Sequence, residues 1–301
     1  MSAAREGLST RVAKSAPSTA RGNSVGARVG RVASRVWLLP VVVVVWELAT
    51  RDGEHAYLPA PSTIWRAVRE RWLAGPPSHL WLTDQATTEV PASVGRLLGG
   101  WAAAGAAGIV LGIALGRSAL LARYAEPIVH FGRAIPPPTL VPLFLVLFKV
   151  GTTMQLATIT FGVIWPVLLN TLDGARFVDR QYMDTAKVFG LTGRQRLLRI
   201  VLPAAAPKIF AGLRLSLPVA LIMMVISEFV GSTEGIGREL FLSQQEFDIP
   251  TMWAVILLLG AIGLAANASF LLVERRLLAW HHGRQAIDTR HTNPDQRRQS
   301  V

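Results

Sequence analysis

Long apolar stretches alternate with short polar segments along most of this chain of 301 residues. A helix crosses about 30 Å of hydrocarbon with roughly 20 mostly apolar residues, because each residue adds about 1.5 Å. We therefore predict an all-α polytopic membrane protein with six transmembrane helices. The six stretches are residues 36–50, 94–116, 126–150, 152–172, 209–231 and 251–273.

The first stretch is the weakest of the six, because it is short and carries Glu47 near its end. The core of a signal peptide is the alternative interpretation. However, a basic leader of 35 residues is long for a signal peptide, and no small-x-small cleavage site closely follows the valines. We predict a retained transmembrane helix.

The composition supports a membrane protein, since 51% of the residues are hydrophobic and only 17% are charged. The chain has no cysteine. This excludes disulfides, thiolate metal sites and cysteine nucleophiles.

The net charge of +12 is distributed unevenly between the two sides of the membrane. If the N-terminus is cytoplasmic, 22 lysines and arginines fall on the cytoplasmic side, five on the other side and four in or beside the spans. Basic residues are retained in cytoplasmic segments, so both termini are predicted to be cytoplasmic. This topology explains the charge without a polyanion, and we expect no nucleic-acid partner.

Three further segments lie outside the spans. Residues 1–34 and 283–301 are polar and lack apolar periodicity, which predicts disordered cytoplasmic tails. On the outer side, the stretch PAPSTIWRAVRERWLAG predicts a helix with Ser62 as its N-cap, and Trp65, Val68 and Trp72 fall on one face. We expect this helix to lie at the lipid headgroups as an interfacial anchor.

Residues 173–208 form the longest cytoplasmic segment between spans. Tyr182, Ala186 and Phe189 give one apolar face to a short helix, and Gly190 is placed to end it with a left-handed backbone. Thr192 begins a capping box that starts a second helix, and Pro203 is expected to stop that helix. The spacing alone is equally consistent with a loop that caps the bundle and with one that docks a partner.

This segment resembles the cytoplasmic "EAA" loop of permease subunits in binding-protein-dependent ABC importers. The matching residues are Asp184-Thr185-Ala186, Gly190 and Ile200-Val201-Leu202-Pro203, with Asp in place of the usual Glu and Thr in place of the middle Ala. Further segments resemble the nitrate/sulfonate/taurine branch of these permeases. They are residues 58–68, 133–148, 166–171, 212–237 and 274–280.

The resemblance implies the ABC type-1 importer permease architecture over residues 35–282, in the bacterial cell membrane. It also implies a pair of permease subunits as a homodimer, cytoplasmic ABC ATP-binding subunits and an external solute-binding protein. The chain has no G-x-x-x-x-G-K-[ST] phosphate loop, so ATP and magnesium would be used by the partner ATPase, and this chain would be neither an enzyme nor a cofactor carrier. The residues implied to contact the ATPase are Asp184, Thr185, Ala186, Gly190, Ile200, Leu202 and Pro203.

Two groups of residues within the spans suggest a translocation pathway. Pro136 and Pro137, in a run of prolines beside Arg133, leave carbonyls without partners, which a bilayer tolerates only where the backbone faces protein or a wet cavity. Residues 133–142 are therefore expected to line the pathway or to form an interface kink, and a buried structural kink is at least an equal alternative. Glu228 is a carboxylate at membrane depth, which is costly and usually functional. It is expected either to pair with Arg133 or to line the pathway, and a purely structural ion pair is an equal alternative.

The remaining features favour packing over chemistry. Gly108 and Gly112 have the spacing of a close helix contact, and the histidines have no spacing typical of a metal site. Two other classes of protein stay as alternatives, namely an ion-coupled secondary transporter or channel and a membrane-embedded enzyme. The expected cargo is a small solute such as a sulfonate, taurine, nitrate or a similar small organic molecule.

Overall fold

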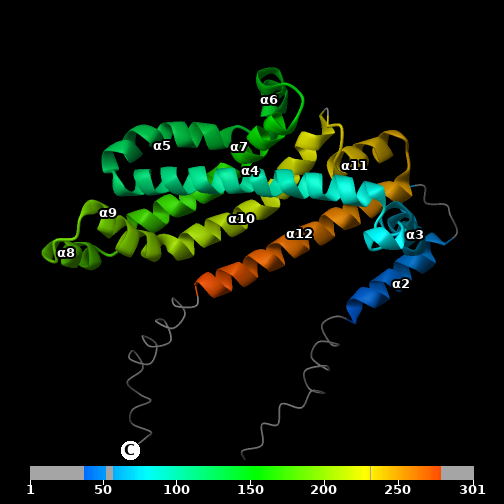
Figure 1. The fold of residues 1–301 in the computed structure, drawn as a ribbon, viewed down its shortest axis with the longest axis horizontal. Helices are drawn as coiled ribbons and strands as arrows, with labels where there is room; N and C mark the ends of the chain where they lie inside the picture. The colour runs from blue at the N-terminus through cyan, green and yellow to red at the C-terminus, as the bar shows by residue number, and fades with distance from the viewer. Residues whose placement is uncertain (1–36, 52–56, 231, 279–301) are drawn as a thin grey trace, which may run out of the picture. The chain divides into compact units, whose positions relative to one another are not determined.

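The computed structural model describes residues 37–51, 57–230 and 232–278, and this part of the chain contains helices and loops without a strand (Figure 1). The prediction of an all-α protein is confirmed. The chain divides into two compact units, residues 1–52 and 53–301. The predicted tails at 1–34 and 283–301 lie outside the described residues.

The first unit contains one described helix, α2 (Leu38–Thr50). Its 13 residues are apolar apart from the end of the helix, where the Thr50 hydroxyl donates a 2.8 Å hydrogen bond to the carbonyl of Trp46. At about 1.5 Å per residue, α2 is about 20 Å long and shorter than the hydrocarbon core. The predicted helix is present, but by length alone it is not a full span.

The second unit contains all other described helices. They are α3 (Pro61–Trp72), α4 (Asp84–Arg117), α5 (Ala119–Ala134), α6 (Val141–Phe148), α7 (Thr152–Arg176), α8 (Arg180–Val188), α9 (Gly193–Arg196), α10 (Leu202–Phe229), α11 (Ile236–Gln245) and α12 (Ile249–Leu277). Short 3₁₀ turns form at Pro77–His79 and Pro137–Leu140, and a π-helical turn at Leu197–Val201 joins α9 to α10.

Four continuous helical stretches of the described chain are long and apolar enough to cross a membrane, and a bent pair of helices raises this number to five. The four contain α4, α7, α10 and α12, and the bent pair is α5 with α6. The predicted spans at 94–116, 152–172, 209–231 and 251–273 therefore correspond to helices. The predicted count of six spans is reached only if α2 also crosses the membrane.

The third predicted span, 126–150, is broken. Ser118 caps α5 by accepting a 3.2 Å bond from the amide of Leu121, so the helix begins earlier than expected. It ends at Ala134, before consecutive prolines that have no amide hydrogen to continue it. After the 3₁₀ turn, α6 leaves at 88° to α5.

Helix α7 lies at the centre of the second unit, between α4 and α10. In α7, 44% of the most apolar stretch is buried within the chain, against 11% in α12, so α12 is peripheral. The core is formed by apolar side chains of four helices. They include Leu97 and Ala104, Ile159 and Val163, Leu217 and Met224, and Phe270.

Small residues allow α4 to approach α7 closely. A Cβ atom on Gly108 would lie 3.0 Å from the Val167 side chain, and one on Gly112 would lie 2.6 Å from Thr171 Cβ. The sequence prediction that these glycines serve helix packing is confirmed.

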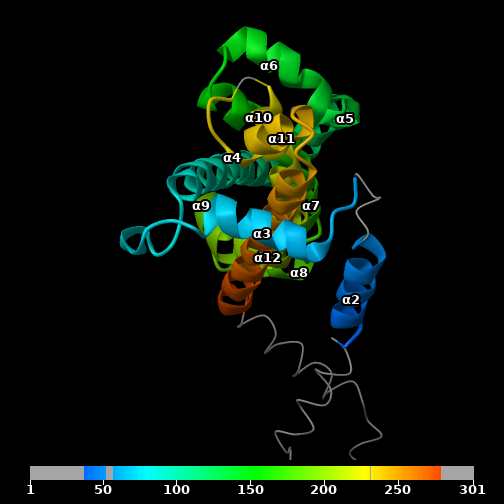
Figure 2. The same ribbon diagram turned by 90° about the vertical axis from the view of Figure 1, so that its right-hand side faces the viewer.

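The connections gather at opposite ends of the long helices (Figure 1). Helices α8 and α9 lie at one end, and α3 and α11 lie at the other, where Figure 2 shows α3 in front of α12. Helix α3 packs on α12 and α4. Its N-cap is Ala60 and not Ser62, because Pro61 is pre-organised for the first helical position. Ile64 and Trp72 face inward, whereas Trp65 is 62% exposed.

Candidate functional site

Glu228 lies near the C-terminal end of α10 and is 1% exposed. Its two carboxylate oxygens accept hydrogen bonds from three groups. The Ser93 hydroxyl and the Arg96 guanidinium reach Oε1 at 2.8 Å, and the Gly237 amide reaches Oε2 at 2.8 Å. A buried charge is stable only when it is paired and hydrogen-bonded, and this carboxylate meets both conditions.

Arg96, the ion-pair partner of Glu228, comes from α4. It also donates to the Glu234 carbonyl at 2.9 Å and approaches the Glu234 carboxylate at 3.2 Å. Its side chain is only 8% exposed, whereas the Glu234 side chain is 46% exposed. One guanidinium thus connects a buried acid on α10 to a half-exposed acid in the loop that follows α10.

The N-terminus of α11 completes this network. The Ile236 amide donates to the Ser93 hydroxyl at 2.8 Å, and the Gly237 amide donates to Glu228. Free amides at a helix N-terminus attract negative charge, so the position of α11 stabilises the carboxylate. Gly235 has φ of +129°, and a Cβ atom there would lie 2.5 Å from Glu228 Oε2, so only glycine fits. We call Ser93, Arg96, Glu228 and Glu234 the buried charge network.

A second polar cluster joins α3, α4 and α11 at the same end. Arg71 on α3 forms an ion pair with Glu239 on α11, which is 3% exposed. Gln85 on α4 bridges two acids, since its amide lies 3.1 Å from Glu239 Oε2 and 3.2 Å from Glu89 Oε1. The first turns of α4 and α11 are therefore held to α3 by side-chain contacts. No group of three or more histidine, aspartate or glutamate side chains in the described residues could hold a metal ion.

The structure does not bring the predicted pathway residues together. Arg133 is exposed at the end of α5 and forms no ion pair among the described residues, so the predicted pairing of Glu228 with Arg133 is wrong. Pro136 is exposed, whereas Pro137 begins the 3₁₀ turn Pro137–Leu140, which packs on α7 and α10. We call the bend between α5 and α6, residues 135–140, the elbow. The elbow and Glu228 are separate features, and pathway lining stays a prediction for both.

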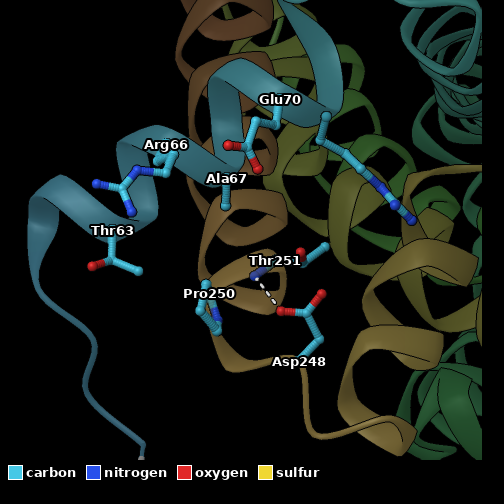
Figure 3. A pocket seen from close by; sticks show the side chains of 8 residues that line it. Thr63, Arg66, Ala67, Glu70, Asp248, Pro250 and Thr251 are labelled. Carbon is cyan, nitrogen blue, oxygen red and sulfur yellow. Dashed lines mark hydrogen bonds between the residues drawn. The ribbon is translucent and has the colours of Figure 1, made fainter. Parts of the chain in front are cut away.

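A polar hollow of about 360 Å³ lies between α3 and the turn that leads into α12 (Figure 3). Arg66 and Glu70 line it from α3, and Asp248 and Thr251 line it from the opposite side. The Asp248 carboxylate caps α12 by accepting a 3.2 Å bond from the Thr251 amide. The lining contains both acidic and basic side chains, so the hollow has no net preference for a ligand of either charge.

The predicted cytoplasmic loop has the expected turn. Helix α8 ends at Val188, and Gly190 adopts φ of +65°. The Gly190 amide bonds the Lys187 carbonyl at 3.0 Å, and the Leu191 amide bonds the Ala186 carbonyl at 3.0 Å. This pair of bonds is the Schellman motif that ends a helix at a left-handed residue. Gly190 therefore ends α8 with a left-handed backbone, as predicted.

Around this turn the loop presents apolar side chains outward. Phe189 is 77% exposed and Val188 is 85% exposed, and Tyr182 on α8 is also exposed. Ala186 is buried, so the expected apolar face of α8 contributes only one side chain to the chain's own core. Of the other residues implied to contact an ATPase, Asp184 and Thr185 are exposed on α8. The remaining three, Ile200, Leu202 and Pro203, lie at the start of α10 and in the turn before it.

The second helix of the loop begins as predicted but does not end as predicted. Thr192 and Gln195 form the capping box, with a 2.8 Å bond from the Thr192 amide to the Gln195 side chain. Pro203 does not stop the helix. The Leu202 amide bonds the Leu197 carbonyl, five residues earlier, and the wider π-helical turn admits the proline at the start of α10.

The sequence interpretation missed Ser93, Arg96 and Glu234 as partners of Glu228. Arg96 was the available signal, because it is an arginine beside the long uncharged stretch of α4, three residues after Ser93 and therefore on the same helix face. No spacing along the chain connects residues 93–96 to residue 228, so the pairing emerges only from the packing of α4 against α10.

Long apolar helices, a proline-broken span, an acid buried among them and a polar loop at one end define a membrane transport subunit. The family described as "binding-protein-dependent transport system inner membrane component" matches residues 108–279. The chain belongs to this family.

The curated relatives cover most of this chain and most of their own length. A putative aliphatic sulfonates transport permease of Bacillus subtilis is 30% identical over 81% of this chain and 87% of its own. A bicarbonate transport system permease of Synechocystis is 29% identical over 77% and 84%. A nitrate import permease of Leptolyngbya laminosa is 28% identical over 86% and 92%. The predicted resemblance to ABC importer permeases of the sulfonate and nitrate branch is confirmed.

A solved structure supports the fold. A chain from inward-facing conformations of the MetNI methionine ABC transporter matches with a TM-score of 0.52, over 61% of this chain and 93% of that chain. At 18% identity the likeness concerns the fold alone. The architecture is that of an ABC type-1 permease, as predicted.

Proposed function

We propose that this chain is the membrane subunit of an ATP-driven importer, and that its cytoplasmic loop at residues 184–207 receives the motion of a separate ATP-binding subunit. Relatives named as a sulfonates transport permease and a nitrate import permease support the class. The observation that carries the coupling role is the exposure of Val188 and Phe189 beside Gly190, at the end of the bundle that the charge distribution assigns to the cytoplasm. Apolar side chains clustered on a surface outside the bilayer indicate a protein interface.

The assembly that follows has three kinds of component. Two copies of this chain span the membrane as a homodimer, two ATP-binding subunits seat the loops, and an external binding protein delivers the solute. Closure of the ATPase pair moves the loops and opens the pathway outward, which couples two distinct sites through a two-state element. The Pro136 and Pro137 elbow and the Arg133 side chain line the pathway between the two copies.

We propose that the cargo is a small anion. Relatives named for aliphatic sulfonates, bicarbonate and nitrate support this class, and a relative named for formylaminopyrimidine is the exception. Calorimetry on the partner binding protein with taurine, ethanesulfonate, nitrate, bicarbonate and a neutral pyrimidine tests the proposal. Binding of the pyrimidine alone would contradict it.

A pair of matched substitutions tests the loop. Phe189→Asp is expected to release the ATP-binding subunit during affinity purification, because it places a charge in an apolar contact. Phe247→Asp is the control, since Phe247 is 73% exposed in the turn between α11 and α12. Helix α11 lies at the opposite end of the long helices from α8 (Figure 1). Retention of the ATPase by Phe189→Asp, or its loss from both variants, would overturn the coupling role.

Transport by a glycine variant gives a second readout. Gly190→Glu is expected to leave the protein inserted while ATP hydrolysis no longer drives uptake. Uptake at the normal rate would contradict the proposed loop function, and uptake that persists after ATP depletion would point to an ion-coupled transporter.

A further inference from the structure

A hollow of about 400 Å³ lies where the end of α4 meets the cytoplasmic loop. Its apolar lining comes from Ile113 on α4, Met183 on α8, and Leu197 and Val201 in the π-helical turn. Two arginines complete the lining, Arg117 and Arg196. No acidic side chain contributes to it, unlike the polar hollow beside α3, where Glu70 and Asp248 accompany the arginines.

Neither arginine of this hollow is satisfied within the described chain. Arg196 has a buried Nε atom without a hydrogen-bond partner. Arg117 is exposed at the end of α4 and makes one long contact, 3.4 Å from Nη1 to the Ala175 carbonyl. Neither forms an ion pair among the described residues. The unpaired Arg196 Nε is costly because it is buried, and the exposed Arg117 guanidinium has donors to spare, so the arrangement favours an anion that accepts from both groups.

The position of Arg117 along α4 gives the depth of the hollow in the membrane. Residues 97–116 carry no charge, and this run of 20 residues at about 1.5 Å each matches the roughly 30 Å of the hydrocarbon core. Arg96 and Arg117 bracket the run, which puts Arg117 at the level of the lipid headgroups. An occupant of this hollow would therefore have its charge at the headgroups and an apolar part toward the bilayer.

We propose that this hollow binds an anionic phospholipid of the cytoplasmic leaflet. The phosphate lies between Arg117 and Arg196, and the start of an acyl chain lies against Ile113, Leu197 and Val201. Basic pockets between transmembrane helices on the cytoplasmic side suit such headgroups. The apolar lining favours a lipid over a free phosphate, because inorganic phosphate would leave that surface unfilled. Only the assignment of the leaflet depends on the proposed function.

Such a lipid would join the end of α4 to the loop. Arg196 belongs to α9, and Leu197 and Val201 form the turn that continues into α10, so the lipid contacts the connection between loop and span. We expect the bound lipid to stabilise the junction between α9 and α10. Membranes without anionic lipid would leave this junction less ordered.

The test uses the full-length protein in detergent, with thermal unfolding followed as lipid is added. Phosphatidylglycerol is expected to raise the unfolding temperature, whereas phosphatidylcholine and inorganic phosphate are not. In the double variant Arg117→Gln/Arg196→Gln the apparent affinity for phosphatidylglycerol is expected to fall about thirtyfold, since each basic residue near an anionic surface contributes about fivefold. Arg199→Gln is the matched control, because Arg199 is an exposed arginine of the same segment that does not line the hollow.

Three results would overturn the proposal. They are an equal effect of phosphatidylcholine, an effect of inorganic phosphate alone, and an unchanged response in the double variant. If the double variant does not fold, photo-crosslinking of the wild-type protein with a phosphatidylglycerol probe decides the question, since labelling must fall on peptides that contain residues 113–117 or 196–201. None of these measurements involves the ATPase or uptake, so failure here is distinguishable from failure of the proposed function.

Discussion

Arg96 on α4 and Glu228 on α10 form an ion pair of 2.8 Å in which both side chains are almost completely buried. Helix α10 begins beside the predicted cytoplasmic loop and ends at this pair, so one helix connects the proposed ATPase contact to the buried charge network. The pair also holds the N-terminus of α11 through Glu228 and the loop before it through Glu234. One guanidinium therefore links α4, α10 and the loop before α11.

We predict that Arg96→Met destabilises the protein by about 3–5 kcal/mol, because it leaves the Glu228 carboxylate buried without its cation. The double variant Arg96→Met/Glu228→Met should recover part of this loss, since no charge then remains uncompensated. Thermal unfolding of the purified variants measures both effects. Lys187→Met is the control, because Lys187 forms an exposed pair with Asp184, and its loss should cost less than about 1 kcal/mol. Equal costs for Arg96→Met and Lys187→Met would contradict the prediction.

A second prediction concerns the turn of the cytoplasmic loop. Gly190 and Gly193 both have open space around them, but only Gly190 is in the left-handed region. Gly190→Ala should therefore cost about 1–2 kcal/mol of loop stability, whereas Gly193→Ala should be neutral. Limited proteolysis within residues 188–194 measures the difference. Identical cleavage rates would show that the left-handed backbone is not required.

The packing of α4 on α7 gives a third prediction. Gly112→Ala would place a Cβ atom 2.7 Å from the Leu168 carbonyl, a backbone atom that cannot move independently of α7. We expect a loss of about 1–3 kcal/mol, as in other overpacked sites. Gly95→Ala on the same helix meets nothing within 4 Å and should be neutral or stabilising. An unfolding temperature for Gly112→Ala equal to that of the wild type would show that the two helices can separate without cost.

The absence of cysteine makes the topology directly testable. A single cysteine at Ser78 should react with a membrane-impermeant maleimide in intact cells, because that turn lies at the end of the helices assigned to the outside. A single cysteine at Gln181 on α8 should react only after permeabilisation. Labelling of Gln181→Cys in intact cells would show that the predicted orientation is wrong.

The sequence predicted those elements whose signals are local. The apolar runs that become α4, α7, α10 and α12 satisfied the length criterion by themselves, and the turn at Gly190 and the capping box at Thr192 depend only on neighbouring residues. The family resemblance added the importer class, which no single local signal contains. The glycines of α4 were recognised because their spacing is itself the contact surface.

Predictions failed where tertiary contacts decide the outcome. Pro203 was expected to end a helix, but a π-helical turn accommodates it, and such a turn has no sequence signature of its own. Arg133 is the partner that the sequence predicts for Glu228, whereas the structure pairs Glu228 with Arg96, because the packing of α4 beside α10 cannot be derived from composition. Helix α11 was missed, since Ile236 is the one large apolar side chain among its buried residues. Its place depends on contacts with Glu228, Arg71 and α12, which no local pattern indicates.

The π-helical turn at Leu197–Val201 sets the direction in which the loop faces. A π turn contains about one residue more than an α turn, and each residue of an α-helix rotates the chain by about 100°. Deletion of one residue here would let an unbroken α-helix form and would swing Phe189 and Val188 about a quarter of the way round the axis of α10. Phe189 and Val188 would themselves be unchanged, yet they would no longer face the proposed ATP-binding subunit.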